Sequence, residues 1–497
     1  MNKKNSIYFI GCLLLAIISE VTLFTETIGI SLSIFVVAFY VFYFYITKKE
    51  IHTHRIIGIF LFLCIWVLTL SFVFIANPYF YRFNLLIIFL LISVHTILIT
   101  SPSFLSWSNV DIFRYMQKKV SFFFKLGKYL IFFFRKSIKE RGNERNYTYI
   151  KRILLGIIIA LPILMILIFL LSLSDQNFSI MIEKILAHLV SLNIKEIGIF
   201  LRIVFLFVFL ALLMKTISKK SVIIPLESKV TEGKWEQATL LTILMAINGL
   251  YLLYTIIQFQ YFFNDVLMKG FTYAAYAKKG FFELIIVTII NISITLLVNI
   301  YTNKRTVFLK MGLSFLIVFS FIILISAHLR LSLYEQAYGY TYLRLFSHSF
   351  IFLLAVFFAF TFIKIWLEKI QLMRFFLLLS LLYYCGLNLI DMDRFIVSKN
   401  LQRFEETNLV DWEYIESLSY STIPVLTEYY QKNPEMNSVK HLLLAKKKLL
   451  DESDVKWQSY NMVDDRARRL LGTIDFENGK PNKQNGKKYR LEDSDDK

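Results

Sequence analysis

The chain contains about eleven stretches of roughly twenty mostly apolar residues, and this repetition restricts its fold more than any other feature. A helix of about 20 apolar residues crosses the hydrocarbon core of a bilayer. Apolar side chains make up 57% of the 497 residues and charged side chains only 18%, below the share of roughly 25% in soluble domains. The sequence therefore predicts an all-α fold, a polytopic bundle of transmembrane helices. The predicted spans are residues 7–24, 28–46, 56–75, 83–99, 153–173, 197–214, 238–263, 284–301, 307–327, 343–363 and 372–390.

The polar residues between the spans divide the chain into five parts. Residues 1–100 form an N-terminal segment of four spans, residues 101–152 a basic, aromatic cytoplasmic segment, and residues 153–390 a membrane core of seven spans. Periodic Leu, Trp and Tyr predict a small helical extracytoplasmic domain over residues 391–472. Residues 473–497 have few apolar side chains, and we expect them to be disordered.

Within the C-terminal domain, the periodicity predicts three helices, near residues 408–418, 421–430 and 435–450. Antiparallel helix pairs are expected from the short connections between them. Three helices are too few to predict a repeat array.

The basic residues predict the orientation of the chain. The first 390 residues hold 37 Lys and Arg residues but only 16 Asp and Glu residues. A cytoplasmic N-terminus places about 28 of these basic residues inside and about seven outside, as the positive-inside rule requires. Eleven crossings then leave the C-terminus outside the cytoplasm. The same bias accounts for the net charge of +19, so we predict a multi-pass cell-membrane protein that binds no nucleic acid.

Residues 120–136 mix aromatic and basic side chains and are too charged to cross the bilayer. This pattern favours a helix in the inner interface, with Phe side chains in the lipid and Lys125, Lys128, Arg135 and Lys136 at anionic lipid head groups. Two alternatives stay open: a helix packed on other spans whose lysines reach the interface, and a specific head-group pocket.

Ionisable side chains cluster near the predicted outer ends of the spans, where each is a candidate functional residue because charge is costly in a membrane. Glu20, Arg202 and His348 lie at this depth, and the Tyr-rich loops 270–283 and 328–344 lie there too. Ion pairs that fix helix packing and a tyrosine belt at the boundary are the simpler interpretations. The candidate binding residues are Tyr273, Tyr276, Lys279, Glu283, His328, Arg330, Tyr334, Glu335 and Arg344.

The sequence has no Gly-rich phosphate loop, no His-Glu-x-x-His, no paired-cysteine motif and no Gly-x-Ser-x-Gly. We therefore predict no cofactor, no metal site and no catalytic residue from motifs. Cys12, Cys64 and Cys385 lie in apolar spans and are predicted to be packing residues. His95, inside the fourth span, is predicted to hydrogen bond to another helix.

The residues that carry a family resemblance lie mainly in the two outer loops. They are Leu173-Ser174-Asp175 with Phe178, residues 260–263, residues 270–283, residues 329–339 with Leu343-Arg344, Ser417-Leu418-Ser419 with Ile423-Pro424, and Trp457 with Asn461 and Arg466-Ala467-Arg468. On these residues the chain resembles an uncharacterised family of bacterial multi-pass membrane proteins, the domain of unknown function four-one-seven-three, over about residues 151–471. Lys278 and Lys279 stand where that family often has arginine. The resemblance implies a membrane-embedded bundle and no established activity.

Three functions are compatible with these features. The first is a non-enzymatic protein of the bacterial cell envelope that presents an outer polar site and its extracytoplasmic domain to a protein, lipid or solute partner. The second is a transporter of a small solute or lipid, which requires polar groups that continue through the bundle. The third is a lipid-processing enzyme, in which Glu283, Glu335 and His328 would supply acid–base groups at one outer pocket.

Overall fold

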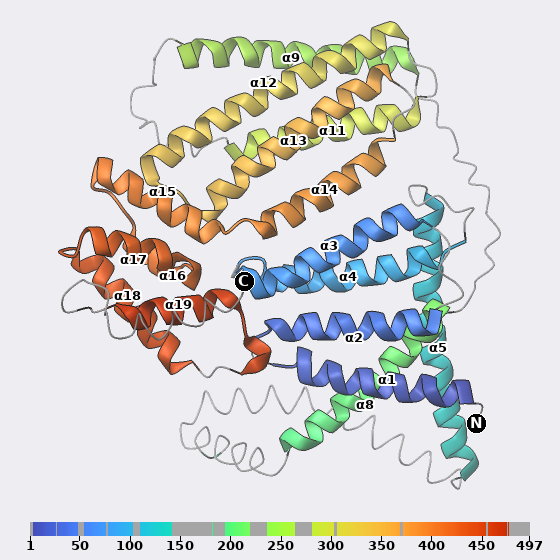
Figure 1. Cartoon of the computed structure of the whole chain (residues 1–497). Helices are drawn as coiled ribbons and strands as arrows, with labels where there is room; N and C mark the ends of the chain where they lie inside the picture. Colours follow the sequence, from blue (N-terminus) through green and yellow to red (C-terminus); the bar gives the residue numbers. More distant parts are fainter. Residues whose placement is uncertain are drawn as a thin grey trace. The chain divides into compact units, whose positions relative to one another are not determined.

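The computed structural model describes residues 3–25, 27–47, 54–75, 78–102, 110–141, 181, 194–218, 236–263, 281–302, 306–367, 371–453, 456–474 and 476 (Figure 1). These residues form helices and no strand, which confirms the predicted all-α class. Nine of the helices described are long and apolar enough to cross a membrane. They are α1 (Lys3–Leu23), α2 (Ile30–Thr47), α3 (Arg55–Phe74), α4 (Tyr81–Ile99), α8 (Ile194–Ser218), α9 (Gln237–Phe263), α12 (Val307–Tyr338), α13 (Tyr342–Trp366) and α14 (Leu372–Leu389).

Two further helices complete the membrane part that the structure describes. Helix α11 (Phe281–Tyr301) contains a shorter apolar stretch, Leu284–Val298, at the predicted eighth span. Helix α5 (Val110–Arg141) covers the basic, aromatic segment. The predicted fifth span, residues 153–173, lies outside the described residues.

The chain divides into two compact units, and each is considered separately. The first contains Met1–Phe62, Phe89–Ile224 and Trp457–Ser459. The second contains Leu63–Ile88, Pro225–Lys456 and Tyr460–Lys497. Helices α3 and α4 each contribute one part to either unit, and the predicted domain boundaries stay a prediction.

Side-chain contacts fix the directions of the spans in the first unit. Helices α1 and α2 are antiparallel, and a Cβ added to Gly11 would lie only 2.0 Å from the Phe42 ring, so glycine permits this close approach. Helix α4 runs parallel to α2, since Phe35 contacts Phe89 and the Tyr43 hydroxyl donates to the Thr96 carbonyl at 3.0 Å. His95 Nδ1 lies 2.9 Å from the Tyr40 hydroxyl, which is the predicted contact between helices.

Helix α8 runs antiparallel to α1. Near the end of α1, Glu20 accepts three hydrogen bonds, of 2.9, 3.1 and 2.6 Å, from Arg202, which lies early in α8. Near its start, the Tyr8 hydroxyl donates to the Ala211 carbonyl late in α8. Helices α4 and α8 thus run in the same direction. This is the direction that eleven crossings predict for α8.

Helix α5 lies against the C-terminal end of α8. The buried Lys119 ammonium donates to the Thr216 carbonyl at 2.9 Å and to the Ile217 carbonyl at 3.2 Å. These carbonyls belong to the last turn of α8, which lacks partners within its own helix. Phe123 also contacts Phe209 of α8. Helix α5 therefore covers the C-terminal end of α8 and provides a hydrogen-bond donor for its last carbonyls.

The core of the second unit is formed by α9, α11, α12 and α13. Leu244, Leu313, Leu316 and Phe358 are among its fully buried side chains. Small residues lie where the helices approach closely, as at Gly312, whose backbone faces Leu241 and Leu244 of α9. In the same unit, the start of α4 lies beside the end of α14, where Asn84 Nδ2 donates to Asn388 Oδ1 at 2.6 Å.

The chain after α14, residues 392–473, has more helices than predicted; we call it the tail domain, although its η2 helix belongs to the first unit. They are α15 (Met392–Thr407), α16 (Trp412–Ser417), η1 (Tyr420–Thr422), α17 (Ile423–Lys432), α18 (Asn437–Glu452), η2 (Trp457–Ser459) and α19 (Met462–Thr473). Helix α16 starts later than predicted because Asn408 ends α15 with φ 56° and Asp411 caps α16 through the Tyr414 amide. The apolar core of the tail domain includes Tyr342 and Leu387 from the ends of α13 and α14.

Lys446 is buried inside the tail domain, at 3% exposure. Its Nζ donates to the Glu416 carbonyl at 2.9 Å and to the Leu418 carbonyl at 2.7 Å, so it satisfies the end of α16. Burial lowers the pKa of Lys446 from 10.5 to about 8, although Asp393 and Glu416 act in the opposite direction. The charged form is thus disfavoured in the folded state.

We expect this lysine to make the stability of the tail domain depend on pH. Below pH 8 the folded state carries the full cost of the buried charge. Between pH 8 and 10.5 only the unfolded chain keeps the proton, so the free energy of unfolding rises, by about 3 kcal/mol at most. Thermal unfolding of the wild type and of Lys446→Met should be compared from pH 7 to pH 10. A constant difference between the two curves would contradict the shifted pKa.

Candidate functional site

Helix α12 is longer than a membrane span. Its 32 residues extend about 48 Å, compared with a hydrocarbon core of about 30 Å. The segment 328–338, predicted as part of a loop, is helical because Leu, Glu, Gln and Ala continue the helix up to Gly339. Gly339 has φ 80°, which favours glycine, and its amide donates to the Glu335 carbonyl at 2.8 Å. The loop to α13 is therefore short, and residues 328–338 belong to the helix.

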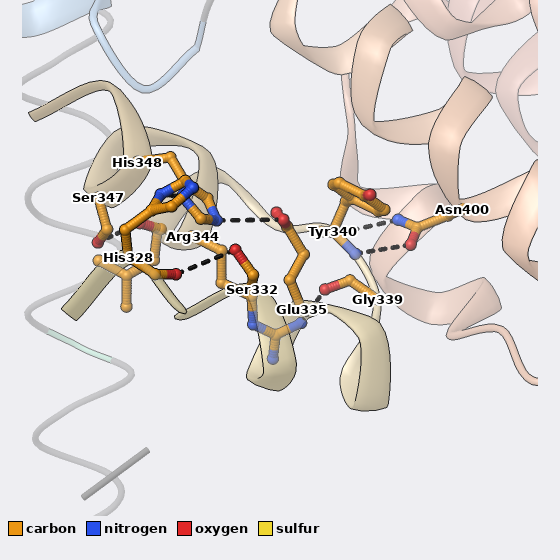
Figure 2. Close-up of polar contacts among 10 residues, drawn as sticks. His328, Ser332, Glu335, Gly339, Tyr340, Arg344, Ser347, His348 and Asn400 are labelled. Carbon is orange, nitrogen blue, oxygen red and sulfur yellow. Dashed lines mark hydrogen bonds and ion pairs between the residues drawn. The ribbon is translucent and has the colours of Figure 1, made fainter. Parts of the chain in front are cut away.

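Three ionisable side chains form a chain of contacts between α12 and α13 (Figure 2). His328 Nδ1 lies 2.9 Å from His348 Nδ1, and His348 Nε2 lies 3.2 Å from Glu335 Oε2. His328 and Glu335 are two helical turns apart, so both face α13. His328 is exposed and Glu335 is buried, with 9% exposure. The chain thus links an exposed imidazole to a buried carboxylate.

The Glu335 carboxylate is only partly satisfied. Its Oε1 atom is buried and has no hydrogen-bond partner among the described residues. A buried carboxylate without full hydrogen bonding is costly, and a positive charge nearby reduces that cost. A protonated His348 supplies such a charge, 3.2 Å from Oε2.

Arg344 packs on tyrosines of the same unit. Its guanidinium carbon lies 4.3 Å from the Tyr334 ring centre and 5.9 Å from that of Tyr338. The guanidinium also donates to the Gly339 carbonyl (Figure 2). These distances are within the range of a cation–π interaction. Arg344 thus fixes the end of α12 to the start of α13.

Helix α15 of the tail domain holds the loop between α12 and α13. Asn400 Oδ1 accepts from the Tyr340 amide at 2.8 Å, and Asn400 Nδ2 donates to the Tyr340 carbonyl at 2.9 Å (Figure 2). One turn later, Arg403 donates to the Gln336 carbonyl at 2.9 Å and to the Ala337 carbonyl at 2.7 Å, at the end of α12. We call Asn400 and Arg403 the α15 clamp. The clamp makes the tail domain part of the site.

The structure brings some of the predicted binding residues together. His328 and Glu335 share one network with His348, and Tyr334 and Arg344 form the adjacent stack. Arg330 is buried in α12, two residues after His328. Tyr273, Tyr276 and Lys279 lie outside the described residues, and so does the side chain of Glu283, which belongs to α11. A shared site between the two predicted loops therefore stays a prediction.

Sequence analysis did not identify the α15 clamp. Asn400 and Arg403 occur in an ordinary polar helix, and no spacing in the sequence links them to residues 60 or more positions earlier. Gly339 is a recognisable signal, because a glycine that ends a helical pattern predicts a C-cap.

A second polar cluster lies deeper in the second unit. The Tyr251 hydroxyl donates to Asn291 Oδ1 at 2.7 Å, and Asn291 Nδ2 donates to the Ser320 hydroxyl at 2.9 Å. Asn248 Nδ2 donates to the Gly312 carbonyl at 2.9 Å. Asn291 and Ser320 are fully buried. This polar cluster, Asn248, Tyr251, Asn291 and Ser320, links α9, α11 and α12 where most neighbours are apolar.

The described residues restrict the chemistry of the outer site. Among them, Glu335 is the carboxylate that reaches the histidine pair. In the same part of the chain, no group of three or more His, Cys, Asp or Glu side chains is arranged to hold a metal ion. The predicted enzyme needs two converging carboxylates; Glu335 is described, and the side chain of Glu283 lies outside the described residues. The carboxylate pair therefore stays a prediction.

Comparison with known families gives one match. Residues 62–429, about three quarters of the chain, match the family described as a domain of unknown function (DUF4153). The expected membership in an uncharacterised family with many apolar helices is confirmed, although the resemblance suggested a different family number. No curated protein and no solved structure matches the chain.

The α15 clamp gives a test of how the site is held. Asn400→Leu leaves the Tyr340 amide and carbonyl without partners, and each unpaired buried group costs roughly 1–3 kcal/mol. We expect a lower midpoint of thermal unfolding and faster proteolysis at the loop between α12 and α13. Gln402→Leu, an exposed position on the same helix, is the matched control. Equal stability of the two variants would mean that the clamp does not hold the loop.

Proposed function

The chain belongs to the DUF4153 family, and we propose that it is an integral protein of the bacterial cell envelope that presents its outer polar site, together with the tail domain, to a partner, lipid or solute. The observation that carries this proposal is the α15 clamp. A tail domain that served only to extend the membrane bundle would not need polar contacts to the loop between α12 and α13, next to the network of His328, His348 and Glu335. Here Asn400 and Arg403 bond to the backbone within five residues of Glu335.

The proposed orientation has the N-terminus in the cytoplasm and the tail domain outside. The contacts of the first unit support it. Helix α5, with its many basic residues, covers the end of α8 that lies beside the start of α1. The η2 helix of the tail lies at the opposite end, where the Gly29 amide before α2 donates to the Gln458 carbonyl at 2.8 Å. Basic segments remain in the cytoplasm, so the end with η2 is the outer one.

Cysteine labelling in intact cells tests this orientation. Ser438→Cys in α18 and Ser121→Cys in α5 are both at exposed positions, and the three native cysteines, which are buried, are first replaced by alanine. We expect a membrane-impermeant thiol reagent to label the tail position alone, and both positions after permeabilisation. Labelling of Ser121→Cys alone from outside would reverse the orientation.

Transport of a small solute or lipid is the second candidate. The polar cluster Asn248, Tyr251, Asn291 and Ser320 favours it, because a pathway needs polar groups at depth. Most polar atoms of this cluster hydrogen bond to each other or to the backbone. This pattern is also typical of polar groups that only hold membrane helices together. The Asn248 Oδ1 and Thr255 Oγ1 atoms of α9 are buried without a partner among the described residues. The cluster therefore supports transport less strongly than the clamp supports presentation.

Two substitutions separate the candidates. Glu335→Gln removes the charge of the outer site, and Asn291→Leu breaks the deep polar cluster. If the protein presents its outer site, Glu335→Gln reproduces the phenotype of a deletion strain while Asn291→Leu does not. Protein level in the membrane is measured for both, so that only correctly inserted variants are compared. A phenotype from Asn291→Leu alone would contradict presentation and favour transport.

The bilayer supplies one proposed partner. Helix α5 exposes Phe124, Tyr129 and Phe132, each more than 60% exposed, and the exposed Lys125 and Lys128 lie among them. Lys119 and Phe123 hold the other face on α8. An exposed face of aromatic and basic residues fits the inner interface, with lysines at anionic lipid head groups.

The lysines give this proposal a test. Each lysine near an anionic surface contributes about 1 kcal/mol, so replacing two should weaken binding of anionic lipid roughly tenfold to thirtyfold. We expect Lys125→Ala/Lys128→Ala to lose the enrichment of anionic over neutral phospholipid that copurifies with the wild type, as counted by mass spectrometry. Lys432→Ala/Lys448→Ala, at exposed tail positions, is the control. Equal enrichment in both double variants would exclude this role for α5.

A further inference from the structure

Helix α12 carries an exposed apolar stripe that is longer than the hydrocarbon core of a bilayer. Its members follow one another at intervals of three, four or seven residues, so they lie on one face of the helix. The α12 stripe includes Phe308, Phe315, Val318, Ile325, Leu329 and Leu333, which are between 37% and 71% exposed. From Phe308 to Leu333 it extends about 38 Å, compared with about 30 Å of hydrocarbon. The stripe therefore reaches into a head-group layer.

The polar residues of α12 show which part of the helix lies at that depth. Lys310 is near the start of the helix, and a charged group stays at the edge of the hydrocarbon. His328 lies about 27 Å further along the axis, which is close to one hydrocarbon thickness. Leu329 and Leu333 follow His328, so the end of the stripe and the imidazole both lie at the level of the head groups of one leaflet.

The imidazole of His328 lies at the edge between the α12 stripe and the contact with α13. Its Nδ1 atom is 2.9 Å from His348 Nδ1, an ordinary hydrogen bond that orients the ring (Figure 2). His328 is exposed and its described hydrogen bond uses Nδ1, so Nε2 is available to a partner at the surface. An imidazole N–H donates to a phosphate oxygen, and more strongly when the ring is protonated.

The charge around His328 favours an anion. Residues 328–345 contain the cations Arg330 and Arg344 but a single carboxylate, Glu335. Glu335 is also buried, at 9% exposure. The net charge of this end of the helix pair is therefore positive, which attracts the phosphates of a bilayer surface.

We propose that His328 binds the phosphate of a membrane phospholipid whose acyl chain lies along Ile325, Leu329 and Leu333. This inference rests on the proposed function, because it selects a lipid as the partner of the outer site. The stripe belongs to a helix that is long and apolar enough to cross a membrane, so its end continues a surface that faces lipid. A solute from water would leave this apolar surface uncovered, whereas an acyl chain covers it while the phosphate contacts the imidazole.

The depth of the stripe is measured with spin labels. Leu329→Cys and Gln336→Cys are two helical turns apart on one face of α12, and both native residues are exposed. Each is labelled in a chain whose three native cysteines are alanine, in nanodiscs of phosphatidylethanolamine and phosphatidylglycerol. We expect the label of Leu329→Cys to contact oxygen dissolved in lipid more than a water-soluble nickel chelate, and the label of Gln336→Cys to do the reverse. Equal access of the chelate to both labels would overturn the placement of the stripe.

Lipid binding to the purified full-length protein tests the role of the phosphate. The protein carries Lys125→Ala/Lys128→Ala, which removes the lysines proposed to bind lipid on α5, and native mass spectrometry counts bound lipid in detergent. We expect phosphatidylglycerol to bind about tenfold more tightly than diacylglycerol with the same acyl chains, which has no phosphate, and His328→Ala to lose this preference. His328→Lys keeps a cationic donor and should restore the preference, which separates loss of a donor from loss of fold. His441→Ala, at an exposed histidine of the tail domain, should leave the preference unchanged.

Three results of the lipid titration would overturn the proposal. They are equal binding of phosphatidylglycerol and diacylglycerol, an unchanged preference in His328→Ala, and displacement of the lipid by excess inorganic phosphate, which would indicate a site for the free anion. The titration needs no phenotype, so its failure leaves the presentation of the outer site to be judged by the Glu335→Gln strain. If phosphatidylglycerol is preferred but that strain behaves as the wild type, the proposed function alone is contradicted.

Discussion

The hydrocarbon core contains no water, so polar groups in the spans depend on partners within the protein. The described spans show how the chain meets this requirement. Tyr40 bonds to His95, Glu20 to Arg202, and Asn291 to Ser320, in each case between two helices. Contacts of this kind set helix direction as well as stability, because moving one helix by a turn leaves both groups unpaired. The apolar side chains place the helices in the membrane, and the polar pairs fix how the helices align.

The sequence predicted the helical class, and ten of its eleven predicted spans coincide with helices that the structure describes, nine of them long and apolar enough to cross a membrane, because span length follows directly from bilayer thickness. It predicted the contact of His95 with another helix for a related reason: a polar group in an apolar stretch is conspicuous. It missed α15 and the length of α12 beyond the membrane, since outside the bilayer polarity no longer marks a helix end. The contact between Asn400 and Tyr340 depends on tertiary structure, which residue spacing alone does not reveal.

The outer site lies where α12 ends, α13 starts and α15 passes the loop between them. Glu335 lies on a long helix whose end contacts Gly339, Arg344 and the α15 clamp, whereas His328 is exposed and contacts His348. Because the clamp bonds to backbone groups at the end of α12, the tail domain and the network are joined through the backbone.

The hydrogen bond from Gly29 to Gln458 joins residues more than 400 positions apart within the first unit. The α1–α2 hairpin is synthesised before η2, which follows it by more than 400 residues. Until η2 is made, the Gly29 amide between the two helices lacks this acceptor. A chain cut before η2 would therefore carry an unfinished first hairpin as well as an incomplete tail.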